Sequence, residues 1–359
     1  MKQLCCRREK FYVKQNFFFT KERKGEKEEI ISYMRKKGAK VGFIIMLTVV
    51  VVVVGGTGCV SVAAAMDGTS ALAKVYADIL DVVMTGDKPV SAEDTLAKVE
   101  KRRKVNESFK VSGFYKFLYS FDTEEYDGFE VCYFGEENAY RVFVYFHGGS
   151  YMWQPLITHY SYCDYLAEKL SARVIMPVYP KAPEYDYIYV MEWLYSFYKS
   201  EFKETPDAFF GDSAGGGLLL SFAMYLRDKG EETPDNLIAF SPCLDLSLQN
   251  PEIADYTASD PMLNVADLRL KLSYYVGRGK ADDPYASPLF GSFENLGRIT
   301  IFIGTREILY PDTVLLKDKL LVAGIEYDYC VYKNQIHTFS IFPMPEREIC
   351  LEKIKSVLS

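Results

Sequence analysis

One serine of the chain lies in a sequence that can make it a nucleophile. Ser213 is the central residue of the pentapeptide Gly211–Gly215, which follows a strand-like run at 208–211 and opens a glycine-rich helical stretch. A nucleophilic serine stands at a sharp strand-to-helix turn, where side chains two residues before and after it would collide. The pentapeptide alone is common in turns, but its place between a strand and a helix favours a nucleophile.

A second glycine-rich turn lies about 65 residues earlier. The segment His147–Ser150 directly follows the strand-like run 141–146. Glycines allow the backbone to face inward and to present N–H donors to a developing oxyanion. The helix that begins after Ser213 offers further N–H groups and the positive end of its dipole. Together the two turns indicate acyl-transfer chemistry.

A general base is expected after the nucleophile in chain order. His337 lies just past the last strand-like run, which is where such a base belongs. The chain has only three histidines. His147 belongs to the glycine-rich turn, and His159 lies early in a helix with no partner motif. We therefore expect His337 to be the base.

The acid that orients the imidazole is expected at the end of the preceding strand. Glu307 follows the run 299–304 at the start of its loop and is our choice. Asp312 is the rival, although after Pro311 it is better placed as a first-turn acid favoured by the helix dipole. Asp260, which precedes a proline, is expected to fix a turn.

Strand-like and helical runs alternate along most of the chain. The strand-like runs are 111–119, 129–134, 141–146, 174–178, 208–211, 237–240, 299–304 and 327–332. Helical runs lie near 160–170, 188–200, 214–229, 264–276, 311–323 and 345–357, and two more are expected at 70–84 and 91–104. This alternation predicts an α/β fold, a mostly parallel sheet with helices on both faces.

The N-terminal region has a different composition. Residues 1–40 carry 13 basic and 5 acidic side chains, whereas the whole chain has a net charge of −7, so the body is acidic and not suited to nucleic acid. Residues 41–65 are uncharged and long enough to cross a bilayer of ~30 Å. The basic flank places the N-terminus in the cytoplasm and the remainder outside.

Two fates remain open for residues 41–65. The segment 63–65 is Ala-Ala-Ala, which resembles a signal-peptidase site, and Met34 could be the true start of a signal peptide. Alternatively the segment stays as an anchor and contacts the membrane. We expect four regions: a basic tail at 1–40, an anchor or signal peptide at 41–65, a helical cap segment at 66–110 and a catalytic domain at 111–359.

The cysteines give no metal-ligand spacing. Five of the eight are scattered through the body of the chain, and we interpret them as buried apolar thiols. They are Cys132, Cys163, Cys243, Cys330 and Cys350.

In their order, the motifs resemble the hormone-sensitive-lipase family of α/β hydrolases, in its bacterial esterase branch. The similarity covers about residues 110–345. It rests on His147–Ser150, Tyr179–Glu184, Gly211–Gly216, Asp260-Pro261, Gly304–Leu309 and the stretch around His337. The resemblance implies an α/β-hydrolase fold whose N-terminal helices, here about 70–105, form a lid or cap.

The resemblance also implies which backbone groups bind the oxyanion. These are the N–H groups of Gly148, Gly149, Ser150 and Ala214. Ser150 stands where the family usually has a third glycine, but its backbone N–H should still donate. Glu307 stands where Asp is commoner, which leaves the choice between Glu307 and Asp312 open.

The implied reaction is hydrolysis of small carboxylic esters through an acyl-enzyme formed on Ser213. No metal or organic cofactor is implied. An amidase or polysaccharide deacetylase uses the same residues, and the fold does not decide between them. A ligand-binding protein on an inactive hydrolase scaffold is a further alternative, which the presence of His337 disfavours. A third possible interpretation is an anchored structural protein.

Overall fold

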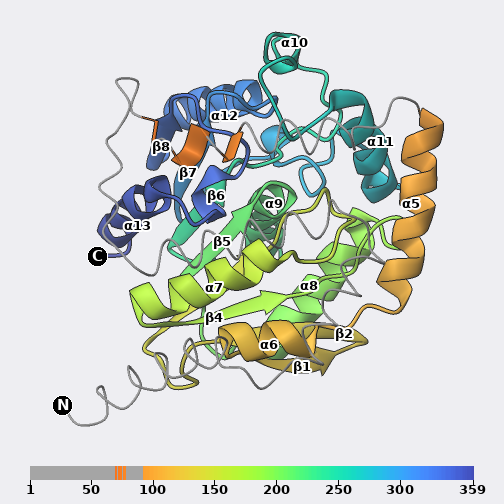
Figure 1. Ribbon diagram of the computed structural model, residues 1–359. Helices are drawn as coiled ribbons and strands as arrows, with labels where there is room; N and C mark the ends of the chain where they lie inside the picture. Colours follow the sequence, from red (N-terminus) through yellow and green to blue (C-terminus); the bar gives the residue numbers. More distant parts are fainter. Residues whose placement is uncertain (1–68, 71, 75, 78–91) are drawn as a thin grey trace, which may run out of the picture. The chain divides into compact units, whose positions relative to one another are not determined.

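Eight strands form one mixed sheet in the part of the chain that the structure, a computed structural model, describes: residues 69–70, 72–74, 76–77 and 92–359 (Figure 1). The strands are β1 (Asp122–Tyr126), β2 (Phe129–Phe134), β3 (Arg141–Phe146), β4 (Ala172–Pro177), β5 (Ala208–Asp212), β6 (Asn236–Phe240), β7 (Arg298–Gly304) and β8 (Tyr327–Tyr332). Their order in the sheet is β1-β2-β4-β3-β5-β6-β7-β8.

The sheet is parallel from β4 to β8, and β2 joins it antiparallel to β4. The carboxyl ends of the parallel strands therefore lie along one edge, where an α/β sheet usually carries its site. β5, β7 and β8 all end at this edge. The predicted α/β fold with a mostly parallel sheet is confirmed.

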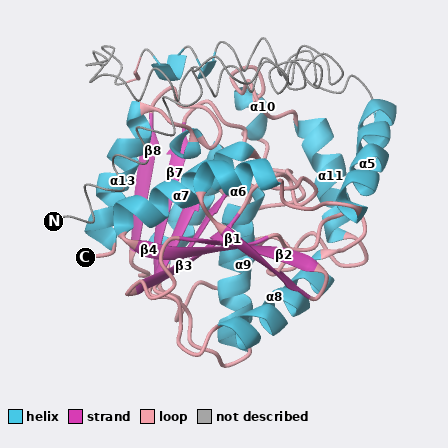
Figure 2. Ribbon diagram, turned by 60° about the horizontal axis from the view of Figure 1, so that its bottom comes forward, coloured by secondary structure: helices cyan, strands magenta, loops and turns pink. Residues whose placement is uncertain are grey.

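Helices cover both faces of the sheet. α7 and α13 lie on one face, and α8 and α9 lie on the other (Figure 2). The helices are α5 (Ala92–Glu107), α6 (Gly113–Tyr119), α7 (Ile157–Leu170), α8 (Tyr187–Glu201), α9 (Ala214–Asp228), α10 (Ile253–Tyr256), α11 (Val265–Val276), α12 (Tyr310–Val322) and α13 (Pro345–Val357), with short 3-10 turns at Pro288–Phe290 and Phe339–Ile341. Residues 72–74 and 76–77 are also helical.

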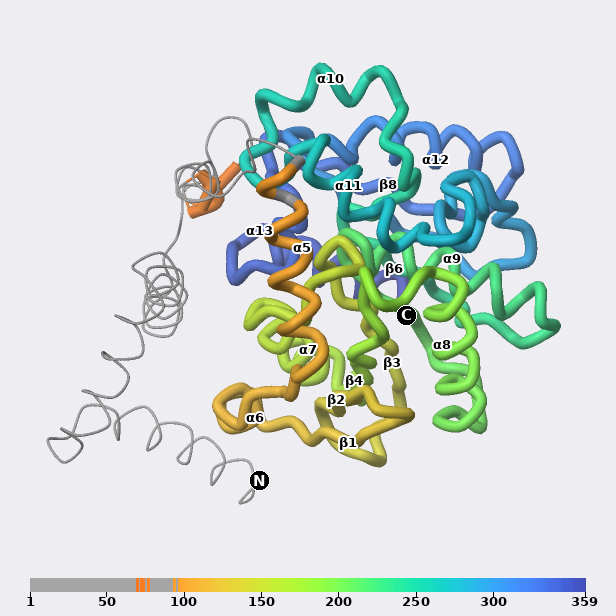
Figure 3. Tube along the Cα trace, turned by 90° about the vertical axis from the view of Figure 1, so that its right-hand side faces the viewer, coloured from red at the N-terminus to blue at the C-terminus, as the bar shows by residue number. Residues whose placement is uncertain are grey.

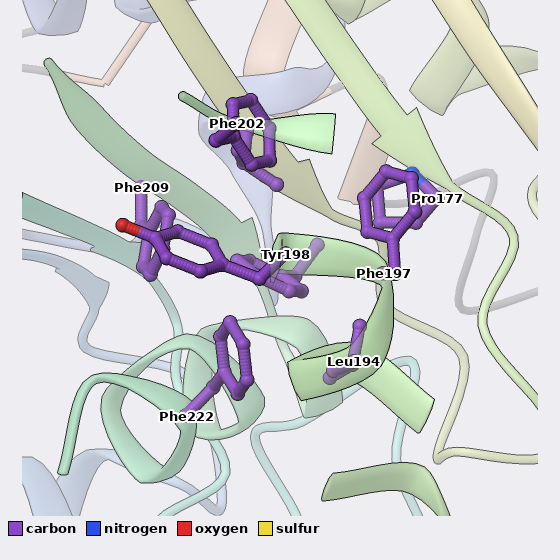
Figure 4. Close-up of a pocket in the computed structure, with 9 residues that line it drawn as sticks. Pro177, Leu194, Phe197, Tyr198, Phe202, Phe209 and Phe222 are labelled. Carbon is purple, nitrogen blue, oxygen red and sulfur yellow. The ribbon is translucent and has the colours of Figure 1, made fainter. Parts of the chain in front are cut away.

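Aromatic side chains fill the layer between the sheet and the helices α8 and α9. Phe197 and Tyr198 of α8 lie around a small apolar cavity together with Phe209 of β5 and Phe222 of α9 (Figure 4). The rings of Phe209 and Phe222 stack with centroids 5.9 Å apart. Since successive strand residues face opposite sides, Phe210 is left to pack on the other face of the sheet. This burial fixes β5, and with it the start of α9.

Helix α5 lies beside α11, near the carboxyl edge of the sheet (Figure 3). The side chain of Asn106 donates to the carbonyl oxygen of Met152 at 3.1 Å, and the guanidinium of Arg102 lies 3.5 Å from the ring centroid of Trp153. These contacts join the predicted cap segment to the loop that follows β3. Whether the segment acts as a lid stays a prediction.

The prediction of a strand at 111–119 is wrong, because residues 113–119 form helix α6. The hydroxyl of Ser112 accepts the N–H of Phe114 and so caps the helix. The aromatic residues suggested a strand, but Phe114, Phe117 and Leu118 follow helical spacing on an exposed face. Strand β1 was not predicted, since its sequence DTEEY has no apolar alternation.

The predicted anchor or signal peptide at 41–65 and the basic tail at 1–40 lie outside the described residues. No helix in the described ranges has both the length and the apolar character that a bilayer crossing requires. The five cysteines of the body are free thiols, as expected. Four are buried and Cys330 is partly buried.

Candidate active site

Ser213 occupies the sharp turn that the sequence predicts between β5 and α9. Its backbone has φ 54° and ψ −121°, a conformation that L-residues rarely adopt. Its N–H donates to the carbonyl oxygen of Phe240, and its own carbonyl oxygen accepts the N–H of Cys243. A side chain at Gly215 would overlap the carbonyl oxygen of Phe146, which explains the need for glycine there. The backbone around Ser213 is thus held by hydrogen bonds to β6 and to the loop after β6, and Gly215 packs closely against the end of β3.

The structure brings His337 to Ser213. The loop after β8 carries His337, and its Nε2 atom lies 2.8 Å from the Oγ atom of Ser213. On the other side of the ring, Nδ1 lies 2.7 Å from Oε2 of Glu307. Since an ionised carboxylate only accepts hydrogen bonds, Nδ1 carries the proton, and Nε2 is left free to accept from the serine hydroxyl.

Glu307 is held by more than the histidine. Its second oxygen, Oε1, accepts the N–H of Gly304 at 2.7 Å and the hydroxyl of Ser241 at 2.8 Å. The Oγ atom of Ser241 in turn accepts the N–H of Thr338, the residue after His337, at 3.0 Å. Ser241 therefore ties Glu307 to the loop that carries His337. The sequence analysis did not predict this role, and the only indication of it in the sequence is that Ser241 directly follows β6.

The charges of the site act on both partners. Burial lowers the pKa of His337, but the hydrogen bond and charge of Glu307, with the charges of Asp260 and Asp212, raise it more, so the net shift is upward. Burial also raises the pKa of Glu307, and its donors His337, Gly304 and Ser241 oppose that effect only in part, so the net shift is upward. We take Glu307 as ionised, because three donors point at its two oxygens.

The rival acid is placed elsewhere. Asp312 lies in the first turn of α12, where Oδ1 accepts from the amide of Asn250 at 2.8 Å and Oδ2 has no partner among the described residues. Burial, reinforced by the charge of Asp245, raises the pKa of Asp312 to about 6 against the lowering effect of Asn250. The structure brings Glu307, and not Asp312, to the imidazole of His337.

Asp260 fixes a turn, as predicted. One carboxylate oxygen accepts the N–H groups of Met262 and Leu263, and the other accepts the N–H of Ile308 at 3.0 Å. The last bond links this turn to the residue that follows Glu307. Asp260 thus supports the loop that carries the acid.

Of the four predicted oxyanion-binding N–H groups, one is occupied and three are free among the described residues. The N–H of Gly148 is occupied, because it donates to Oδ1 of Asp212 at 2.9 Å, so this residue is not available as a donor. The N–H groups of Gly149, Ser150 and Ala214 have no acceptor within the described part of the chain. Gly149 has φ 119° and Ser150 has φ 53°. Two successive N–H groups of this turn are therefore free of acceptors among the residues described, as is the one that follows Ser213.

Across residues 92–359 and the few described before them, no three His, Cys, Asp or Glu side chains group as ligands. The chemistry that this arrangement supports is proton transfer from a serine hydroxyl to an imidazole, next to free backbone donors.

A strand–turn–helix serine, a histidine after the last strand and an acid after the strand before it define the active-site layout of α/β hydrolases. The sequence model of the family described as alpha/beta hydrolase fold matches residues 143–341, which is more than half of the chain. The chain belongs to this family.

Named relatives agree with the family. An esterase of Acinetobacter venetianus is 27% identical over 212 residues, 58% of this chain and 70% of that protein. An acetyl-hydrolase of Streptomyces hygroscopicus is 28% identical over 203 residues, 55% and 68% of the two chains. A solved esterase of the bacterial hormone-sensitive lipase family has a TM-score of 0.61 at 23% identity, and covers 75% of this chain and 98% of its own. Human hormone-sensitive lipase is 28% identical over 148 residues, 39% of this chain and 14% of that protein, and with the family match this confirms the resemblance to the hormone-sensitive-lipase family.

Proposed function

We propose that the protein is a serine carboxylesterase that hydrolyses small carboxylic esters through an acyl-enzyme. The observation that carries the proposal is the unbroken chain of contacts from Ser213 through His337 to Glu307, with distances of 2.8 and 2.7 Å. The esterase and acetyl-hydrolase among the relatives support the same substrate class.

The reaction follows from the positions of the three side chains. Ser213 attacks the ester carbonyl carbon while Nε2 of His337 accepts its proton, and Glu307 stabilises the imidazolium that forms. The oxyanion of the tetrahedral intermediate is bound by the N–H groups of Gly149, Ser150 and Ala214. His337 then protonates the leaving alcohol, and water, activated by the same histidine, releases the acid from Ser213.

An amide or a polysaccharide acetyl group could enter the same reaction. That one relative is an acetyl-hydrolase supports a short acyl group as one part of the substrate of this protein. A substrate panel separates these possibilities: p-nitrophenyl esters of increasing acyl length, the matching anilides, and an acetylated sugar. We expect the short esters to be turned over fastest. Anilide turnover equal to that of the ester of the same acid would contradict the assignment as a carboxylesterase.

We also propose that the catalytic domain lies outside the cytoplasmic membrane. The support is the uncharged segment 41–65 behind a basic flank. Protease added to intact cells, or to spheroplasts if there is an outer membrane, should then degrade the domain. Complete protection, with the protein soluble after lysis, would reject export.

A further inference from the structure

A second histidine–carboxylate pair lies behind the glycine-rich turn. Asp212, the residue before Ser213, is 2% exposed and accepts three hydrogen bonds. Its Oδ1 atom accepts the hydroxyl of Tyr145 at 2.7 Å and the N–H of Gly148 at 2.9 Å. Its Oδ2 atom lies 3.3 Å from Nε2 of His159. A buried carboxylate needs such partners, because an unpaired charge would be strongly destabilising.

The tautomer of His159 follows from its other contact. The backbone N–H of Leu156 donates to Nδ1 of His159 at 2.8 Å, so Nδ1 carries no proton in the neutral ring. Nε2 then carries the proton and donates to Asp212. His159, on the first turn of α7, is 3% exposed and uses both ring nitrogens. The position of His159 in the sequence did not indicate Asp212 as its partner.

Asp212 sets where the glycine-rich turn lies relative to the nucleophile. The turn is fixed at one end by the bond from Gly148 to Asp212, and at the other by the N–H groups of Met152 and Trp153, which both donate to the carbonyl oxygen of Gly149. A side chain at Gly148 would overlap the carboxylate, so only glycine allows this approach. The free N–H groups lie between these two anchors.

We propose that His159 is a positioning residue, which holds the Asp212 carboxylate so that Gly148 and the oxyanion-binding turn keep their place beside Ser213. The inference rests on the proposed esterase function, because only a reaction that forms an oxyanion needs this alignment. His159 touches no reacting atom. Its effect reaches the oxyanion through Asp212 and Gly148, and it should therefore appear in kcat and not in KM.

Two substitutions of His159 separate its two contacts. In His159→Gln the side-chain amide reaches the position of Nε2 and can still donate to Asp212. In His159→Asn the shorter amide lies near the position of Nδ1, where it can accept from Leu156 but does not reach Asp212. Loss of one oxyanion donor costs about 10²–10³ in kcat, so for a displaced turn we expect His159→Asn to lower kcat by about tenfold. We expect KM to stay within about twofold of the wild-type value, and His159→Gln to restore most of kcat.

Hydrogen exchange tests the same idea without turnover. In the peptide that covers residues 146–153, His159→Asn should exchange faster than the wild-type protein, and His159→Gln should resemble it. Wild-type hydrolysis of p-nitrophenyl butyrate tests the proposed function separately, so an inactive wild-type protein leaves the exchange comparison valid. Equal kcat values and equal exchange for the two variants would overturn the positioning role. A fall in melting temperature alone, with kcat unchanged in His159→Asn, would also overturn it.

Discussion

The Nε2 atom of His337 lies 2.8 Å from the Oγ atom of Ser213, although 124 residues separate them in the chain. The contact exists because β5 and β8 end at the same edge of the sheet, β5 before the serine and β8 before the histidine. The imidazole is aimed by Glu307, which follows β7, one of the two strands that lie between β5 and β8 in the sheet. The account of function depends on this line of three side chains.

The pH dependence of activity should follow His337. The imidazole must be neutral to accept the proton, so kcat/KM should rise as the pH passes its pKa. Because the pKa of His337 is raised, we expect the rise above the ordinary value of about 6.5. In Glu307→Gln the effect of burial remains and only the charges of Asp260 and Asp212 oppose it, so the rise should move to lower pH. A wild-type profile that is flat between about pH 5 and 8 would contradict the role of His337.

Glu307 and Asp312 can be compared directly as candidates for the acid. A neutral amide at the true position removes the charge that stabilises the imidazolium, so Glu307→Gln should lower kcat by about 10³–10⁴. Asp312→Asn should stay within about tenfold of wild type, because its carboxylate contacts Asn250 and not the histidine. Circular dichroism checks that both variants are folded. The reverse ranking would make Asp312 the acid.

Asp312 should instead affect stability, in a defined pH range. Its pKa is about 6 in the folded protein and about 4 in an unfolded chain, so the folded state holds this proton more tightly. Stability from this group is therefore lost as the pH rises from about 4 to 6, by up to about 3 kcal/mol. Urea unfolding at several pH values should show Asp312→Asn gaining stability relative to wild type across this range. A constant difference between the two proteins would refute the shift.

The start of the predicted cap segment should stabilise the loop that bears the base. The buried carboxylate of Glu346 accepts the N–H of Ser70 at 2.8 Å, the hydroxyl of Ser70 at 2.9 Å and the amide of Gln335 at 3.1 Å. Ser70→Ala removes two buried bonds of the hydroxyl, the one it donates to Glu346 and the one it accepts from the N–H of Ala73, so we expect a loss of about 2 kcal/mol in the free energy of unfolding. Ser356→Ala, which removes an exposed hydroxyl on α13, is the matched control. Equal losses in the two variants would show that the buried contact contributes nothing.

Much of the fold could be predicted because buried strands and amphipathic helices leave distinct patterns. The apolar runs of β5 and β7 are buried by tertiary packing on both faces, and each matches its predicted run closely. The edge strand β8 is only partly buried, but it also matches its predicted run. The acidic strand β1 was not predicted, because most of its side chains face solvent and it is a strand only through its pairing with β2. Its signal was the hairpin turn Asp127-Gly128, where both residues have positive φ.

The site could be predicted only where a motif names the residue. Ser213 and His337 follow from local sequence and chain order. The roles of Asp212, Ser241 and His159 could not be predicted, because their partners lie 53 to 97 residues away and meet only in the fold. Gly148 was predicted as an oxyanion donor, but its N–H is used by Asp212, and a sequence pattern does not show which of three successive N–H groups is free.

The most direct test of the central claim is the rate of ester hydrolysis by Ser213→Ala. The variant should be purified as residues 66–359 beside the wild-type protein, and both should be assayed with p-nitrophenyl butyrate. Alanine removes the attacking oxygen and keeps the turn, so we predict that kcat falls by about 10³-fold or more at unchanged folding. A kcat within about tenfold of wild type would contradict the assignment of Ser213 as the nucleophile, and with it the proposed mechanism.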